Sequence, residues 1–230
     1  MAESRALLVL AWPMVIAQLA QIGTGVVDTI MAGHYSATDL AAIAIGYNIW
    51  LPLYLFFIGV SLGATYIISQ HVGAGREKEV RDILPQSLWL ALALGLICGP
   101  LCYYAEPLLE LLELEAATQA RCLAYLRAVA FGLPAAALFE ALRCHTQGIG
   151  VMRPFAIASV LAFLVNIPLN YALMYGSWGA PELGAQGCGW ATVISMWLSA
   201  LTLCALMTRA ERLKPYLPPL RLVAPSLSAI

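Results

Sequence analysis

The segment 7–32 reads LLVLAWPMVIAQLAQIGTGVVDTIMA and is apolar or small at almost every position. About twenty such residues in a helix cross a hydrocarbon core about 30 Å thick, so the segment is long enough to span a membrane. Its one ionisable side chain is Asp28. An ionisable group at membrane depth is energetically costly, which makes Asp28 a candidate functional residue.

The composition of the whole chain agrees with this first segment. The 230 residues are 61% hydrophobic and 11% charged, whereas soluble domains are roughly 45–50% apolar and about 25% charged. The formal net charge of −1 provides no basic face for a nucleic acid. No nucleophile elbow, zinc-protease motif or phosphate-binding loop occurs in the sequence. We therefore expect an integral membrane protein that is not an enzyme.

Hydropathy predicts six membrane-spanning helices, and hence an all-α membrane fold. Each predicted helix has about the twenty apolar residues that a span requires, and turn residues such as Gly73-Ala74-Gly75 separate them. The predicted segments are 7–32, 40–70, 83–104, 118–143, 155–175 and 187–207.

The charged loops predict the orientation of these helices. If the N-terminus lies inside, most Lys and Arg residues fall on inner segments such as 76–81 and 209–214, while the outer segment 106–115 is acidic. The positive-inside rule then places both termini in the cytoplasm. Aromatic residues, Trp12, Trp50 and Trp178 among them, are expected at helix ends as an interfacial belt.

A polar stripe runs along the first predicted helix. Gln21, Thr24 and Asp28 are spaced by three and four residues, so they share one helix face. Such a stripe is expected to face the protein rather than lipid. It forms either a cation site or a structural hydrogen-bond cluster with a neutral Asp28, and we favour the cation site because Asn or Ser would serve structure at lower cost.

The fifth predicted helix contains Asn166-Ile167-Pro168-Leu169-Asn170. The two asparagines are one turn apart on one face, and Pro168 leaves the Leu164 carbonyl without its helical N–H partner. Together with Asp28, these hard oxygen atoms would hold Na⁺ or orient a proton-carrying carboxylate. A helix kink capped by asparagines explains the same residues equally well.

Several short motifs occur in one fixed order along nearly the whole chain. They include Ala11-Trp12-Pro13, Val27-Asp28-Thr29-Ile30-Met31-Ala32-Gly33, Ile49-Trp50-Leu51-Pro52, Arg153-Pro154, Asn166-Ile167-Pro168-Leu169-Asn170-Tyr171 and Gly189-Trp190-Ala191-Thr192. In this ordered set the chain resembles the amino-terminal half of a multidrug and toxic compound extrusion (MATE) transporter of the NorM-like branch.

The resemblance implies a cation-coupled antiporter that exports organic cations and other drugs across the bacterial inner membrane. The coupling ion would be H⁺ or Na⁺, with no other cofactor, and transport would follow alternating access. The implied cation-binding residues are Asp28, Asn166, Asn170 and Thr192, with Na⁺ at the first three.

Two further sets of residues have implied supporting roles. Polar side chains would extend the cation site along the first helix, and prolines would allow the helices to kink. These residues are Gln21, Thr24, Pro13 and Pro168.

Members of this family have two six-helix lobes around a central drug cavity. The sequence after the sixth predicted helix, Pro215-Tyr216-Leu217-Pro218-Pro219-Leu220, is similar to the cytoplasmic connection between lobes. We assign residues 1–208 to one lobe and 209–230 to an interlobe linker or tail. Either the chain is a fragment that lacks the second lobe, which we favour, or two copies pair to rebuild the cavity.

Two other classes of function remain open. A flippase for a lipid-linked precursor, from the same superfamily, would share the six-helix lobe but should have a more cationic interior. A non-transporting membrane scaffold would tolerate loss of the Asp28 charge.

Overall fold

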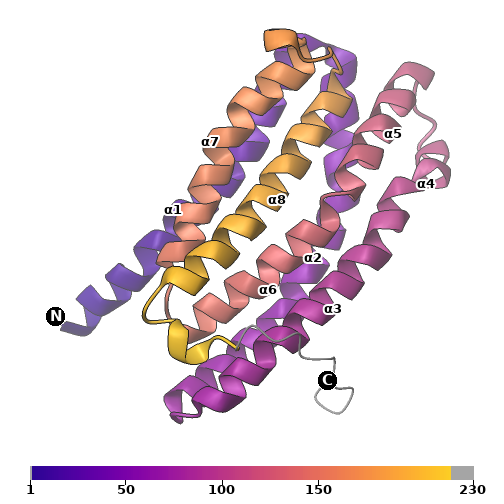
Figure 1. Ribbon diagram of the computed structural model, residues 1–230. Coiled ribbons are helices and arrows are strands. Elements are labelled where there is room, and N and C mark those ends of the chain that lie inside the picture. The colour runs from indigo at the N-terminus through magenta and orange to yellow at the C-terminus, as the bar shows by residue number, and fades with distance from the viewer. Residues whose placement is uncertain (1, 219–230) are drawn as a thin grey trace.

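The computed structural model describes residues 2–218, with side-chain surroundings from residue 11 onward. In this part of the chain all regular structure is helical, and the long helices run side by side along one axis (Figure 1). The all-α prediction is therefore confirmed. The elements are α1 (Ala2–Tyr35), α2 (Ala37–Gly73), α3 (Glu77–Tyr103), α4 (Glu106–Glu110), α5 (Ala116–Ala130), α6 (Leu133–Ile149), α7 (Arg153–Tyr175), η1 (Ser177–Gly179), α8 (Ala185–Arg209) and η2 (Lys214–Tyr216).

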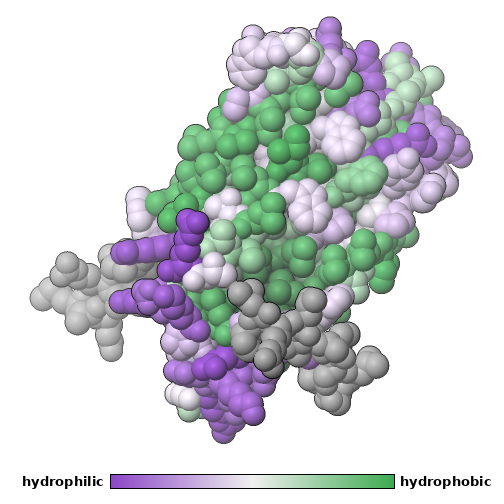
Figure 2. Space-filling view, viewed as in Figure 1, coloured by the Kyte–Doolittle hydropathy of each residue, from purple (hydrophilic) through white to green (hydrophobic). Residues whose placement is uncertain are grey.

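Five helices of the described chain are each long and apolar enough to cross a membrane. A sixth span results if α5 and α6, which are bent by 48° relative to each other, are counted as one. Figure 2 shows a broad hydrophobic surface over the middle of the bundle, with hydrophilic residues gathered toward its ends. That distribution suits a protein whose middle faces lipid.

The structure differs from the predicted continuous segment 118–143. The helix is interrupted at Phe131 and Gly132, between α5 and α6 and just before Pro134. Proline has no N–H to donate into a continuing helix, so it is tolerated in the first turn of a new one. The indole Nε1 of Trp197 on α8 donates to the carbonyl of Phe131 at 3.1 Å, which satisfies a backbone acceptor at the bend.

Two groups of helices make the most extensive contacts. α7 packs against α1 and α8, and α6 packs against α2 and α3 (Figure 1). Pro13 lies inside α1 and Pro168 inside α7, and both helices continue on either side of the proline.

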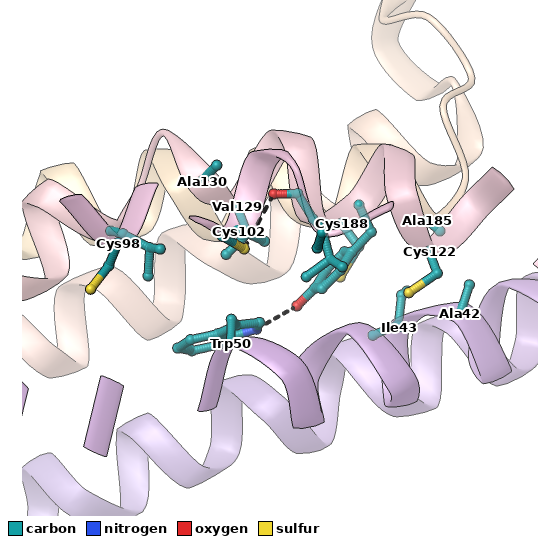
Figure 3. Packing of buried hydrophobic residues seen from close by; sticks show 14 of the residues in the cluster. Ala42, Ile43, Trp50, Cys98, Cys102, Cys122, Val129, Ala130, Ala185 and Cys188 are labelled. Carbon is teal, nitrogen blue, oxygen red and sulfur yellow. Dashed lines mark hydrogen bonds between the residues drawn. The ribbon is translucent and has the colours of Figure 1, made fainter. Parts of the chain in front are cut away.

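One buried cluster lies among α2, α3, α5 and α8, where small side chains let the helices approach closely. Cys98, Cys102, Cys122 and Cys188 are buried there as free thiols (Figure 3). The prediction that Trp50 belongs to an interfacial belt is wrong. Trp50 is only 7% exposed, and its Nε1 donates to the Tyr125 hydroxyl at 3.2 Å. It lies well inside the long α2, where a core position is available.

The predicted linker or tail, 209–230, lies partly outside the described residues. Its described part includes η2, and the Pro215 carbonyl accepts a hydrogen bond of 2.5 Å from Arg81 Nε on α3. Leu213 is fully buried. The described residues after α8 thus pack against the end of the bundle where α3 begins.

Candidate functional site

Three helices bring the predicted cation-binding residues together. α1 carries Asp28, α7 carries Asn166 and Asn170, and α8 carries Thr192. Asp28 and Thr192 are each 7% exposed, and both asparagines are fully buried. Gly23 allows α1 to approach α7, because a Cβ atom there would lie 3.1 Å from the Phe163 ring.

The Asn170 amide links the members of this group. Its Nδ2 donates to Asp28 Oδ1 at 2.5 Å and to Asn166 Oδ1 at 2.9 Å. Thr192 Oγ1 lies 3.5 Å from Asp28 Oδ2 and donates to the Cys188 carbonyl at 3.0 Å. Asp28 has no ion-pair partner among the described residues.

Two amide atoms of the site have no hydrogen-bond partner among the described residues. These buried atoms are Asn170 Oδ1 and Asn166 Nδ2. A buried polar atom without a partner is unusual in a folded protein. Rotation of the Asn170 amide by half a turn would exchange its Nδ2 for Oδ1 beside Asp28. The group would then present carboxylate, amide and hydroxyl oxygens, which are the ligands that hard cations prefer.

Asp28 also lines a cavity of about 680 Å³. Gln21 and Thr24 lie on the same wall, as the predicted stripe requires. Neither is hydrogen-bonded to Asp28 among the described contacts, and Thr24 Oγ1 instead donates to the Ala20 carbonyl at 3.1 Å. Pro13 is absent from this wall, and Pro168 lies between the two asparagines on α7.

Sequence reasoning missed the aromatic wall of the cavity. Tyr47, Trp50 and Tyr54 line it from α2, and Tyr125 lines it from α5. The ring centroids of Tyr47 and Trp50 are 5.3 Å apart, and those of Trp50 and Tyr54 are 5.9 Å apart. Their spacing of three and four residues was the signal that could have identified one face of α2.

A buried ion pair on α6, between Glu140 and Arg143, is hydrogen-bonded to this wall. Glu140 Oε2 accepts from Arg143 Nε at 2.6 Å, and Glu140 Oε1 accepts from the Tyr54 hydroxyl at 2.7 Å. Arg143 also donates to Gln147 Oε1 at 3.0 Å. A buried ion pair is costly unless its remaining polar atoms are hydrogen-bonded, and these contacts meet that requirement.

A third buried carboxylate, Asp39, lies in the first turn of α2, next to the beginning of α8. Asp39 is 1% exposed, forms an ion pair with Arg121 of α5, and accepts from the backbone N–H of Ala185 at 2.8 Å. The preceding residue, Gly184, has a φ of +55°, which favours glycine. Asp39 thereby caps the beginning of α8, the helix that carries Thr192.

Comparison with known proteins identifies close relatives of the chain. The multidrug resistance protein PmpM of Pseudomonas aeruginosa is 42% identical over 211 residues, covering 91% of this chain and 44% of PmpM. The probable multidrug resistance protein NorM of Acinetobacter baylyi is 41% identical over 209 residues, covering 91% of this chain and 46% of NorM. The chain therefore spans about half the length of the curated relatives it matches.

Solved structures share the fold at lower identity. One is a MATE protein in the bent conformation, with a TM-score of 0.85 and 21% identity over 98% of this chain and 49% of that one. Another is the eukaryotic MATE transporter AtDTX14, with a TM-score of 0.85 and 18% identity over 96% of this chain and 48% of that one.

A family model described as MatE matches residues 13–172, a stretch that contains Asp28, Asn166 and Asn170. Because that match takes in well over half of the sequence, the chain belongs to the multidrug and toxic compound extrusion (MATE) family.

Proposed function

We propose that residues 1–208 form one six-helix lobe of a cation-coupled antiporter that exports organic cations and other drugs. The observation that carries the proposal is a single buried carboxylate, Asp28, on the wall of a cavity of about 680 Å³. That volume is typical of a small-molecule site. The names of the relatives, which are multidrug resistance proteins, support drugs as the substrate class.

Coupling follows from the charge of the site. Asn166, Asn170 and Thr192 are neutral, so Asp28 gives the group one negative charge. A proton, a Na⁺ ion or the positive charge of a drug would each neutralise that charge. Each therefore weakens the binding of the others at Asp28, and such reciprocal coupling is typically worth about 1–3 kcal/mol. H⁺ and Na⁺ both suit this set of ligands.

The cavity also suggests a partner for the lobe. Ile22, Val26 and Tyr47 line it and are 64%, 51% and 40% exposed, so the cavity is open between α1 and α2. A missing second lobe, or a second copy of this chain, would close that side. Residues 209–230 would serve as the linker or tail. We place the protein in the bacterial inner membrane with both termini cytoplasmic, in keeping with its charge distribution.

The other two classes of function receive less support. A pyrophosphate-bearing lipid precursor requires cationic groups, yet no Lys, Arg or His is found among the described residues that line the cavity. A scaffold gives no reason to bury a carboxylate that has no ion-pair partner among the described residues, because such burial is costly at membrane depth.

Substitution of the carboxylate tests the proposal. Cells expressing the chain, alone and together with a second lobe from a relative, are assayed for ethidium efflux with wild-type protein and with Asp28→Asn. We expect efflux to fall to background in Asp28→Asn while the protein still inserts. Asp82→Asn is the matched control, because Asp82 is exposed on α3 and does not line the cavity. Undiminished efflux by Asp28→Asn would reject the proposal.

A further inference from the structure

Several hydroxyl groups on the cavity wall already donate their protons to the protein. Ser195 donates to the Ala191 carbonyl at 2.8 Å, and Ser199 donates to the Met196 carbonyl at 2.8 Å. Thr24 donates to the Ala20 carbonyl at 3.1 Å. Each of these oxygens therefore offers only lone pairs to a ligand in the cavity.

Two further hydroxyls of the wall, those of Thr192 and Tyr54, follow the same pattern. Thr192 donates to the Cys188 carbonyl. Tyr54 donates to Glu140, whose other carboxylate oxygen accepts from Arg143. An ionised carboxylate can only accept hydrogen bonds, so this ion pair keeps Tyr54 as the donor and leaves its lone pairs available.

Donors are fewer on the described part of the wall. Gln18, Gln21 and Asn48 carry amide N–H groups, and Asn48 already donates one of its own to the Ala44 carbonyl at 2.8 Å. The hydroxyls of Tyr47, Tyr125 and Ser159 have no acceptor among the hydrogen bonds of the described wall. The amide and hydroxyl oxygens of these same residues can also accept, so acceptor atoms outnumber donor atoms. No cationic side chain is present among the described lining residues, and Asp28 adds a strong acceptor. The polar surface of the cavity is thus biased toward hydrogen-bond acceptors around one negative charge.

We propose that this cavity selects organic cations that carry N–H donors over equally charged cations whose nitrogens are fully alkylated. Both kinds of ligand neutralise Asp28. Only an N–H donor also replaces the hydrogen bonds that water makes to Asp28 and to the wall hydroxyls, and a buried acceptor left without a partner is costly. The inference rests on the proposed function and specifies its substrate class.

A matched pair of fluorescent dyes tests the preference directly. A rhodamine methyl ester with unsubstituted amino groups and tetramethylrhodamine methyl ester share one xanthylium cation and differ in N–H against N-methyl. Their binding to the purified full chain in lipid nanodiscs is measured by fluorescence anisotropy, with empty nanodiscs as the background. We expect the N–H dye to bind about tenfold more tightly, as one or two additional hydrogen bonds would give. Hydrophobicity alone would favour the methylated dye.

Removal of two wall acceptors should reduce this preference. In the double variant Ser195→Ala/Ser199→Ala we expect the affinity ratio of the two dyes to fall to about threefold or less, mainly because the N–H dye binds less tightly. Ser69→Ala/Thr208→Ala is the matched control, because both hydroxyls donate to the carbonyl three residues earlier and are exposed outside the cavity. Thr24→Val, on a different helix, repeats the test should the double variant fold poorly.

The outcomes separate this inference from the proposed function. If both dyes bind equally, or the methylated dye binds more tightly, and the ratio is unchanged in the serine variant and in Thr24→Val, the donor preference is overturned. Loss of both dyes in Asp28→Asn would still support the cavity as an organic-cation site. Binding of neither dye to the wild-type chain would overturn both proposals.

Discussion

Asn170 holds the proposed cation-binding group together through one amide nitrogen. That nitrogen donates to Asp28 on α1 and to Asn166 one turn earlier on α7. Asn166 makes only the second of these hydrogen bonds in the described structure, and its own Nδ2 has no partner. The two asparagines are equally buried, but Asn170 contributes more hydrogen bonds to the group than Asn166 does.

Replacement of each asparagine by alanine should expose this difference. Asn170→Ala leaves Asp28 and Asn166 without their shared donor, and we expect it to lower the free energy of unfolding by about 1–3 kcal/mol. Asn166→Ala should cost less, since Asn170 can still donate to Asp28. Thermal unfolding in detergent measures both, with the exposed Asn48→Ala as control. An equal loss in Asn166→Ala and Asn170→Ala would contradict these roles.

Residue-scale features differed in how far the sequence could predict them. Asp28 stood out because it is the only ionisable side chain in its segment. Its hydrogen-bond partner Asn170 lies 142 positions away on another helix, and no periodicity within one helix reveals such a contact. The chemistry of their oxygen atoms and the resemblance to a family both suggested that these residues act together. The aromatic wall of α2 was not predicted, because its rings also suit an interfacial belt.

At the scale of elements, the bend between α5 and α6 depends on close approach of α8. A Cβ atom on Gly132 would lie 2.6 Å from Met196 Sδ, and Trp197 donates to the Phe131 carbonyl. Hydropathy could not show the break, because the residues on both sides are apolar and average into one segment. Gly132 and Pro134 were the residues that could have indicated the break, but the prediction included both in one continuous helix, 118–143.

A double-mutant cycle tests the packing at this bend. Gly132→Ala should destabilise the protein by about 1–3 kcal/mol, because the added methyl overlaps Met196. Adding Met196→Ala should recover part of that loss, which chemical denaturation would measure as a favourable coupling energy. Gly59→Ala is the control: nothing lies within 4 Å of its Cβ position, so we expect a neutral effect or a gain of about 0.5–1 kcal/mol. Strictly additive losses would reject the steric account.

At the scale of the whole molecule, six crossings, with α5 and α6 counted together as one, would place the start of α1 and the end of α8 on the same side of a membrane. The start of α1 and the η2 turn lie toward the same end of the bundle (Figure 1). Composition and segment lengths predicted the membrane class and the all-α fold, because both depend only on average apolarity. The arrangement of helices into a lobe depends on contacts between distant segments and required the structure.

Cysteine labelling tests the proposed orientation. The background is Cys204→Ser, which removes the one exposed native thiol among the described residues. In intact, right-side-out inner-membrane vesicles, Trp178→Cys should react with a membrane-impermeant maleimide that is added to the outside. Lys78→Cys should react only after the vesicles are opened, because the segment 76–81 is predicted to be cytoplasmic. Trp178 is 75% exposed, so access is not limited by packing. The opposite labelling pattern would contradict the proposed orientation.

The most direct test of the central claim is competition at Asp28. Ethidium affinity is measured for the purified chain in nanodiscs while Na⁺ concentration and pH are varied independently, with wild type, Asp28→Asn and Asp82→Asn side by side. We predict that added Na⁺ or added protons weaken ethidium binding to wild type and to Asp82→Asn by about fivefold or more. Asp28→Asn should bind ethidium weakly and show neither dependence. The account would be contradicted if ethidium affinity did not depend on Na⁺ concentration or pH, or if it were unchanged in Asp28→Asn. Either result would argue against a shared cation and drug site at this carboxylate.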